Sequence, residues 1–206
     1  MSAITPLHSL SPSRPAPRVP LDRDGRFEKV ARWVVRRVYG KVLDPLEASF
    51  HHRPALASML VLEATASFWK KLPPTLRALA VMAPAREIGC SWCMDFGYWE
   101  YHHRGVDPRK LRDIGAWRTS SAYSPLERAV LEYAVAATAT PSAVTDEMVA
   151  ALRADLSDGQ MVELAALVSL ENYRSRTNAG LGLTSQGFAD DCGVPSSTEH
   201  RPPGAP

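Results

Sequence analysis

The chain has 206 residues, of which 45% are hydrophobic, and a formal net charge of +2 at pH 7. This length is enough for one sizeable buried core, and so small a charge gives no reason to expect a nucleic-acid partner. No apolar run approaches the roughly 20 residues that span a bilayer, so we expect no membrane partner. With three cysteines and no hydrophobic segment behind a basic start, we expect a cytoplasmic protein in a reducing compartment.

Proline, serine and arginine dominate residues 1–24, which cannot bury enough apolar surface to offset the entropy of ordering. We expect a disordered tail there, a single all-α domain over 25–195, and a second disordered tail over 196–206. No run alternates convincingly at period two, so the sequence predicts no strand.

Helical spacing of apolar residues first covers 25–41 and then 54–71. Two consecutive prolines preset the first turn of a third helix, 75–88. Pro84 lies inside this helix, and we expect it to break or kink the helix and to leave free N–H groups just beyond it.

Short polar residues precede the later helical patterns and are typical N-caps: Asp107, Ser124, Thr145 and Ser157. The helices that they open are expected to end near residues 115, 137, 156 and 178. Ser124-Pro125-Leu126-Glu127 has the pattern of a capping box with proline in the first turn.

Between these groups of helices, residues 87–103 (EIGCSWCMDFGYWEYHH) contain the closely spaced pair Cys90 and Cys93. Cysteines at this spacing lie one helical turn apart and can close a disulfide without rearranging the fold. If a helix begins here, its unpaired N–H groups and the positive end of its dipole lower the pKa of a nearby thiol. Because the thiolate attacks peroxides and disulfides, the pattern predicts dithiol redox chemistry. Glu87 would share the side of Cys90 if the helical turn extended backward, where a carboxylate could shuttle a proton.

Two other interpretations of the cysteine pair are open. A zinc site needs four ligands, but there is no second CxxC, His102 and His103 are too far along the chain for the usual spacing, and Cys192 is remote. We therefore expect no metal and no other cofactor. The second alternative is a pair of buried, inert cysteines that share this spacing by chance.

The order of these features resembles the carboxymuconolactone decarboxylase / alkylhydroperoxidase D-like family, in its redox branch. The resemblance covers 50–195 and rests on LPPTLRALAVMAPAREIGCSWCMDFG, SPLERAVLEYAVAATATP with VTDEMVAALR, and QMVELAALVSLENYRSRTNAGLG. It implies an all-α bundle of the alkylhydroperoxidase D-like type, usually oligomeric, with the CxxC at the start of a buried helix. It also implies a peroxidase or disulfide reductase in which Cys93 attacks a hydroperoxide, Cys90 resolves the sulfenic acid, and a thiol or dithiol reductant restores the pair. The helix start by itself could equally activate Cys90.

This chain departs from the family's CxxCxxxH pattern, since Gly97 stands where the histidine would lie one turn beyond Cys93. The upstream glutamate of the family's proton relay is also absent. Candidate replacements are Glu87, Asp95 and Glu100, although Asp95 could instead cap a backbone N–H. The alternative functions are a helical scaffold or binding module with a vestigial CxxC, and a lactone decarboxylase, against which the cysteine pair argues.

Apolar stripes on nearly every predicted helix, with five tryptophans spread along the chain, indicate more apolar surface than one bundle buries. Large aromatic side chains are favoured in interface cores, so we expect a homodimer or a larger ring.

Overall fold

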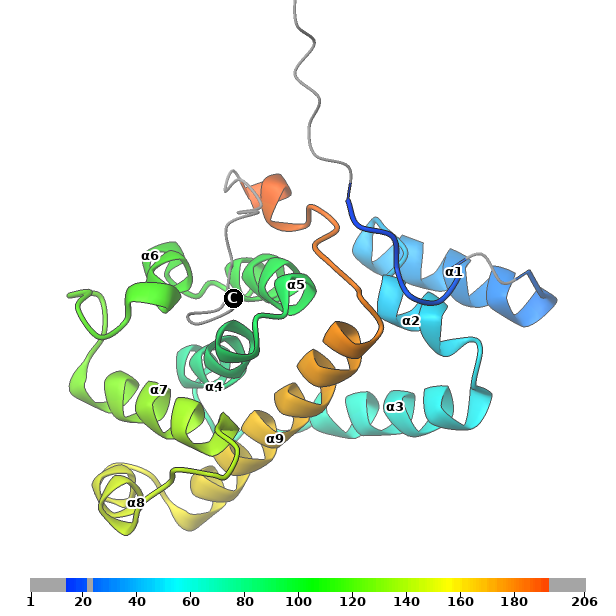
Figure 1. Ribbon diagram of the computed structural model, residues 1–206. Helices are drawn as coiled ribbons and strands as arrows, with labels where there is room; N and C mark the ends of the chain where they lie inside the picture. Colours follow the sequence, from blue (N-terminus) through cyan, green and yellow to red (C-terminus); the bar gives the residue numbers. More distant parts are fainter. Residues whose placement is uncertain (1–13, 22–23, 193–206) are drawn as a thin grey trace, which may run out of the picture.

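The computed structural model describes residues 14–21 and 24–192, which fold into helices joined by turns, with no strand among them (Figure 1). The elements are α1 (Arg26–Tyr39), α2 (Asp44–Ser49), α3 (Arg53–Ala66), α4 (Pro74–Ile88), α5 (Ser91–His103), α6 (Pro108–Arg112), η1 (Asp113–Ala116), α7 (Pro125–Thr138), α8 (Asp146–Arg153), α9 (Asp158–Gly180) and η2 (Ala189–Cys192). The predicted all-α class is confirmed. In this described part, no helix is long and apolar enough to cross a membrane.

Helix α4 is the central helix of the main bundle and packs against α5, α7 and α9 (Figure 1). Residues 78–85 of α4 are all buried, which is expected of a helix that is surrounded on every side. We expected a break or a kink at Pro84, and the break does not occur: α4 continues to Ile88. A proline in mid-helix costs about 3 kcal/mol, and the burial of the apolar residues around it outweighs that cost. The chain instead leaves the helix at Gly89, in the left-handed region with φ 78°.

The predicted N-caps are confirmed, since each side chain accepts a hydrogen bond from a backbone N–H in the first turn of its helix: Asp107, Ser124, Thr145 and Ser157. Ser124 and Glu127 form the predicted capping box, and Ser157 forms a second one with Gln160. These local signals fix where α6, α7, α8 and α9 begin.

Helices α1, α2 and α3 share a smaller apolar cluster around Leu46, Phe50 and Leu56. Helix α2 is only six residues long, and the sequence does not predict it. Several large apolar side chains of α1 and α3 are nevertheless exposed: Phe27, Val30, Trp33, Val34 and Val38 on α1, and Leu60, Val61 and Leu62 on α3.

Residues 14–21, which the sequence places in a disordered tail, lie beside the C-terminal end of α9. Arg18 makes three hydrogen bonds of 2.8–2.9 Å to carbonyls there, those of Ala179, Gly180 and Leu181. The rest of the predicted tails, 1–13, 22–23 and 196–206, lies outside the described residues.

Candidate active site

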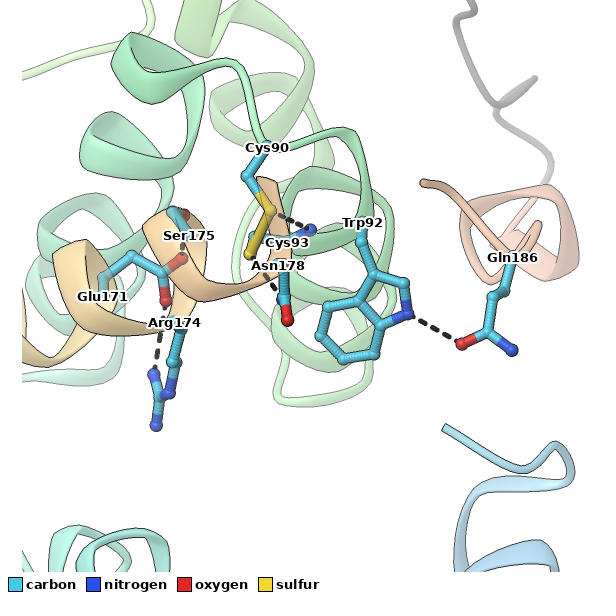
Figure 2. The surroundings of a disulfide bond; sticks show 8 residues. All are labelled: Cys90, Trp92, Cys93, Glu171, Arg174, Ser175, Asn178 and Gln186. Atoms are coloured by element: carbon cyan, nitrogen blue, oxygen red, sulfur yellow. Dashed lines mark hydrogen bonds and ion pairs between the residues drawn. A yellow bond between two sulfur atoms is a disulfide. The ribbon is translucent and has the colours of Figure 1, made fainter. Parts of the chain in front are cut away.

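The cysteine pair lies at the junction between the end of α4 and the start of α5. Cys90 is the N-cap of α5, and its Sγ accepts a hydrogen bond from the backbone N–H of Cys93 at 3.2 Å (Figure 2). The two residues form a disulfide, with their Cα atoms 5.3 Å apart. The expected position of the CxxC at the start of a buried helix is confirmed, so the positive end of the α5 dipole acts on these sulfurs.

Asn178 contributes to this site from α9. Its Nδ2 donates a hydrogen bond to Cys93 Sγ at 3.3 Å, and the side chain is buried (Figure 2). Each sulfur therefore has its own N–H donor, a backbone amide for Cys90 and a side-chain amide for Cys93. A donor directed at sulfur favours the thiolate over the thiol and lowers the thiol pKa. No pattern around the cysteines identifies Asn178 as a site residue, since it is 85 residues from Cys93.

Both cysteines are largely enclosed, with exposed fractions of 2% for Cys90 and 6% for Cys93. Beside them, Trp92 Nε1 donates to Gln186 Oε1 at 2.7 Å, which fastens the segment after α9 to the first turn of α5 (Figure 2). Cys93 is thus the slightly more exposed of the two residues.

Asp95 is buried and accepts two backbone N–H bonds, from Gln186 and Ala189, each at 2.8 Å. This is the N–H capping that the sequence left open as an alternative to a relay role. The carboxylate therefore holds the segment that leads into η2 against α5.

Glu87 and Glu100, the other two carboxylates predicted for proton transfer, lie elsewhere. Glu87 is exposed and lines a cavity of about 100 Å³ together with Arg86 and Arg118. Glu100 is paired with Arg104 at 2.6 Å. In the described part of the chain, no hydrogen bond or ion pair joins Glu87 or Glu100 to either sulfur. A proton-transfer role for each stays a prediction.

Gly97 stands where the family pattern has a histidine, and it lies against α4. A Cβ at this position would lie 2.6 Å from Met82 Sδ, and Met82 is fully buried in α4. A side chain at position 97 would therefore require the buried Met82 side chain to move.

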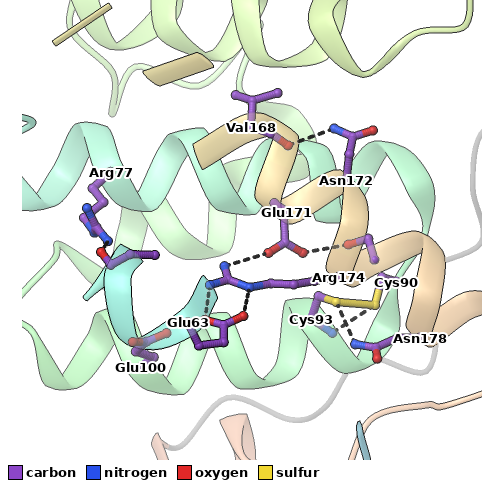
Figure 3. A network of polar contacts seen from close by, with 12 residues as sticks. Glu63, Arg77, Cys90, Cys93, Glu100, Val168, Glu171, Asn172, Arg174 and Asn178 are labelled. Atoms are coloured by element: carbon purple, nitrogen blue, oxygen red, sulfur yellow. Dashed lines mark hydrogen bonds and ion pairs between the residues drawn. A yellow bond between two sulfur atoms is a disulfide. The ribbon is translucent and has the colours of Figure 1, made fainter. Parts of the chain in front are cut away.

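A second polar group on α9 lies near the sulfurs. Glu171 is 2% exposed, accepts a hydrogen bond from Ser175 Oγ at 2.7 Å, and receives Arg174 Nη1 at 3.4 Å (Figure 3). Burial raises the pKa of Glu171 to about 7, against the lowering effect of Arg174 and Ser175. Glu171, Ser175 and Asn178 are spaced by four and three residues, so they share one face of the helix. That spacing is the signal from which the sequence could have identified them.

The remaining sequence candidates do not form a metal site. Within residues 14–21 and 24–192, no three His, Cys, Asp or Glu side chains are grouped so that they could hold a metal ion. Cys192 is a free, partly buried thiol in η2, and burial together with the nearby Asp191 raises its pKa. A raised pKa makes Cys192 a poor nucleophile.

Comparison with known proteins identifies the group to which this fold and dithiol belong. A model of the carboxymuconolactone decarboxylase family matches residues 54–136, which include α4, the CxxC and most of α7. The protein YnjA of Escherichia coli K12 is 32% identical over 180 residues, covering 85% of this chain and 96% of YnjA. The chain belongs to the carboxymuconolactone decarboxylase family.

Solved structures share its fold. A peroxidase-related protein from Ralstonia eutropha JMP134, described as an alkylhydroperoxidase AhpD core, superposes with a TM-score of 0.73 at 16% identity, covering 85% of this chain and 96% of that one. The debrominase Bmp8, in complex with 2,3,4-tribromopyrrole, superposes with a TM-score of 0.71 at 19% identity, covering 85% and 91%. At these identities the likeness concerns the fold, and it confirms the AhpD-like bundle predicted from the sequence.

Proposed function

We propose that this protein is a dithiol oxidoreductase that reduces hydroperoxides with Cys90 and Cys93. The observation that carries the proposal is the CxxC at the start of α5, where both sulfurs accept N–H hydrogen bonds and are close enough to be joined. Inert structural cysteines have no need of two donors directed at sulfur, whereas a reactive thiolate does.

In the proposed reaction the Cys93 thiolate attacks one oxygen of the hydroperoxide and breaks the O–O bond. The departing alkoxide takes up a proton to become an alcohol, and Cys93 becomes a sulfenic acid. The Cys90 thiol then attacks this sulfur, and its proton leaves with the hydroxyl group as water. Two electrons have passed to the peroxide, and a separate thiol or dithiol reductant returns them by disulfide exchange.

Cys93 is assigned the attacking role because it has the side-chain donor Asn178 and the larger exposed fraction. The family resemblance implies the same order. The peroxidase-related description of the Ralstonia neighbour supports this reaction class, and the debrominase neighbour shares the fold with a different substrate.

The test is to reduce the purified protein, expose it to a slight excess of tert-butyl hydroperoxide, alkylate the remaining thiols and map them by mass spectrometry. We expect a Cys90–Cys93 disulfide to form, and the variant Cys93→Ser to consume no peroxide. Cys192→Ser is the matched control and should behave as wild type. Full alkylation of both motif cysteines after peroxide treatment would leave the scaffold alternative as the better description.

A further inference from the structure

Arg86, in the last turn of α4, is a cation that the proposed reaction does not use. Its guanidinium lies against η1, where a Cβ on Gly115 would be 3.2 Å from Arg86 Nε and 3.5 Å from Nη2. The third nitrogen, Nη1, is buried and has no hydrogen-bond partner in the described part of the chain. A buried donor costs free energy unless water or a ligand supplies an acceptor. Arg86 therefore needs an acceptor that the fold does not provide.

Arg86 lines the cavity of about 100 Å³ that lies between α4, η1 and α7, and Arg118 and Glu87 line it too. Arg118 lies over the Trp117 ring, with its guanidinium carbon 4.3 Å from the ring centroid. Across residues 14–21 and 24–192, no ion pair involves either arginine or Glu87. Two cations and one carboxylate leave one positive charge in the lining, which a monoanion would neutralise.

The rest of this lining is apolar. Ala83, Ile114 and Trp117 are at most 8% exposed, and Val135 of α7 is partly buried beside them. About 10–15 Å³ is enough for one water, so the cavity has room for several waters or for a small organic ion. Water would satisfy Arg86 but would leave these apolar side chains wetted, whereas a ligand with a hydrocarbon part would also cover them. The cavity thus combines unpaired cations with an apolar wall.

We infer that this cavity binds a short-chain carboxylic acid in its ionised form, with the carboxylate on Arg86 and Arg118 and the hydrocarbon part against Trp117 and Ile114. A planar carboxylate matches the fork of donors on a guanidinium, and charge-assisted bonds of this kind are about twice as strong as neutral ones. Phosphate fits less well, because Glu87 would repel its second charge and because it has no apolar part. The inference does not depend on the dithiol function.

The first test follows the unfolding of the full chain in urea with increasing sodium butyrate, compared with sodium chloride at the same ionic strength. A ligand that binds only the folded protein raises the free energy of unfolding as its concentration rises. We expect butyrate to raise the urea midpoint progressively. Butyramide, which has the same shape without the charge, should leave the midpoint unchanged, and inorganic phosphate should raise it less than butyrate does.

Variants of the lining then assign the effect to this cavity, with butyrate affinity measured by calorimetry. Arg86→Gln should weaken binding by about ten- to a hundredfold, and Arg118→Gln by less, because Arg118 is exposed and its charge is screened. Glu87→Gln removes a like charge and should strengthen binding. Arg109→Gln is the matched control: Arg109 is an exposed arginine that bonds to Ser121 Oγ at 2.8 Å outside the cavity, so this variant should bind as the wild type does.

Arg86→Met separates a binding role from a structural one. Methionine has no unsatisfied donor, so without butyrate this variant should be at least as stable in urea as the wild type, and butyrate should not stabilise it further. Should this variant fail to fold, Arg118→Gln and Glu87→Gln, which change exposed side chains, still give their opposite shifts. The proposal is overturned if butyrate stabilises the wild type no more than sodium chloride or butyramide does, or if Arg86→Met responds to butyrate as the wild type does. Water alone would then be the partner of Arg86 Nη1.

Discussion

At the scale of single residues, the side-chain amide of Asn178 is the contact that distinguishes Cys93 from a merely buried cysteine. A hydrogen bond to a charged group contributes about 1.5–3 kcal/mol, equivalent to about one to two pKa units. We therefore expect Asn178→Ala to raise the pKa of the Cys93 thiol by that amount. The pH dependence of alkylation measures it.

Asn172→Ala is the control for this prediction. Asn172 lies on the same helix but donates to Thr138 Oγ1 and to the Val168 carbonyl instead of to sulfur. Its loss should leave the thiol pKa unchanged. Equal shifts in the two variants would show that α9 has been disturbed as a whole and that the amide of Asn178 has no specific effect.

At the scale of single residues, the sequence predicted the features of the site that depend on neighbouring residues in the chain. Two local features determine the geometry of the cysteine pair: the spacing of Cys90 and Cys93, and the helix that begins beside them. Residues 90–93 contain both signals. Asn178 and Glu171 reach the site only because α9 packs against α4 and α5, and no pattern around the cysteines refers to them. Because the sequence predicts α9, the remaining signal for these two residues was that their spacing places them on one face of that helix.

At the scale of elements, the close approach of α4 and α5 depends on Gly97. Replacing it with alanine places a methyl group against the buried Met82, and overpacking of this kind costs about 1–3 kcal/mol. This exceeds the gain of about 1 kcal/mol in helix propensity. Gly97→Ala should therefore lower the free energy of unfolding in urea, and Gly97→His should lower it further and not restore a catalytic base.

Gly180→Ala provides the comparison. Gly180 is also helical, but a Cβ there would meet nothing within 4 Å. This variant should be as stable as the wild type or up to about 1 kcal/mol more stable. If Gly97→Ala were equally stable, space would not be the reason for the missing histidine.

The sequence predicted a helix and its ends well where a local signal such as an N-cap marks them. It predicted them poorly where tertiary packing determines whether the helix forms or continues. Ser124 and Ser157 cap their helices through contacts three residues away, so the sequence contains the whole signal. The helix does not break at Pro84 because the local cost of the proline is outweighed by burial in the centre of the bundle. Six-residue α2 is too short for a periodic pattern, and it is held by the cluster around Phe50.

At the scale of the whole molecule, the outer side of α1 exposes apolar side chains that a monomer would leave in water. Val30, Val34 and Val38 recur every fourth residue, and Trp33 beside them is 69% exposed. Contiguous apolar surface of this kind marks an interface. We expect a homodimer or larger assembly, with a mass in light scattering at least twice the chain mass of 22.6 kDa.

Trp33→Glu should shift this assembly toward the monomer, because a charge in an interface core must be desolvated without a partner. Val162→Glu is the control, since Val162 is equally exposed at 69% but lies on α9. It should keep the wild-type mass. A monomer mass for the wild-type protein at micromolar concentration would contradict the prediction.

The hydrogen bonds that complete the site also set an order of events during synthesis. Cys93 and Asn178 are 85 residues apart, and the bonds from Arg18 to the end of α9 span 161 and 162 residues. Both motif cysteines therefore leave the ribosome before α9 has been made, and for that interval Cys93 lacks its side-chain amide donor. Residues 14–21 are synthesised early, but they can pack against the end of α9 only after that helix has been made. The hydrogen bond from Asn178 to Cys93 Sγ is thus a contact that forms only after α9 has been synthesised.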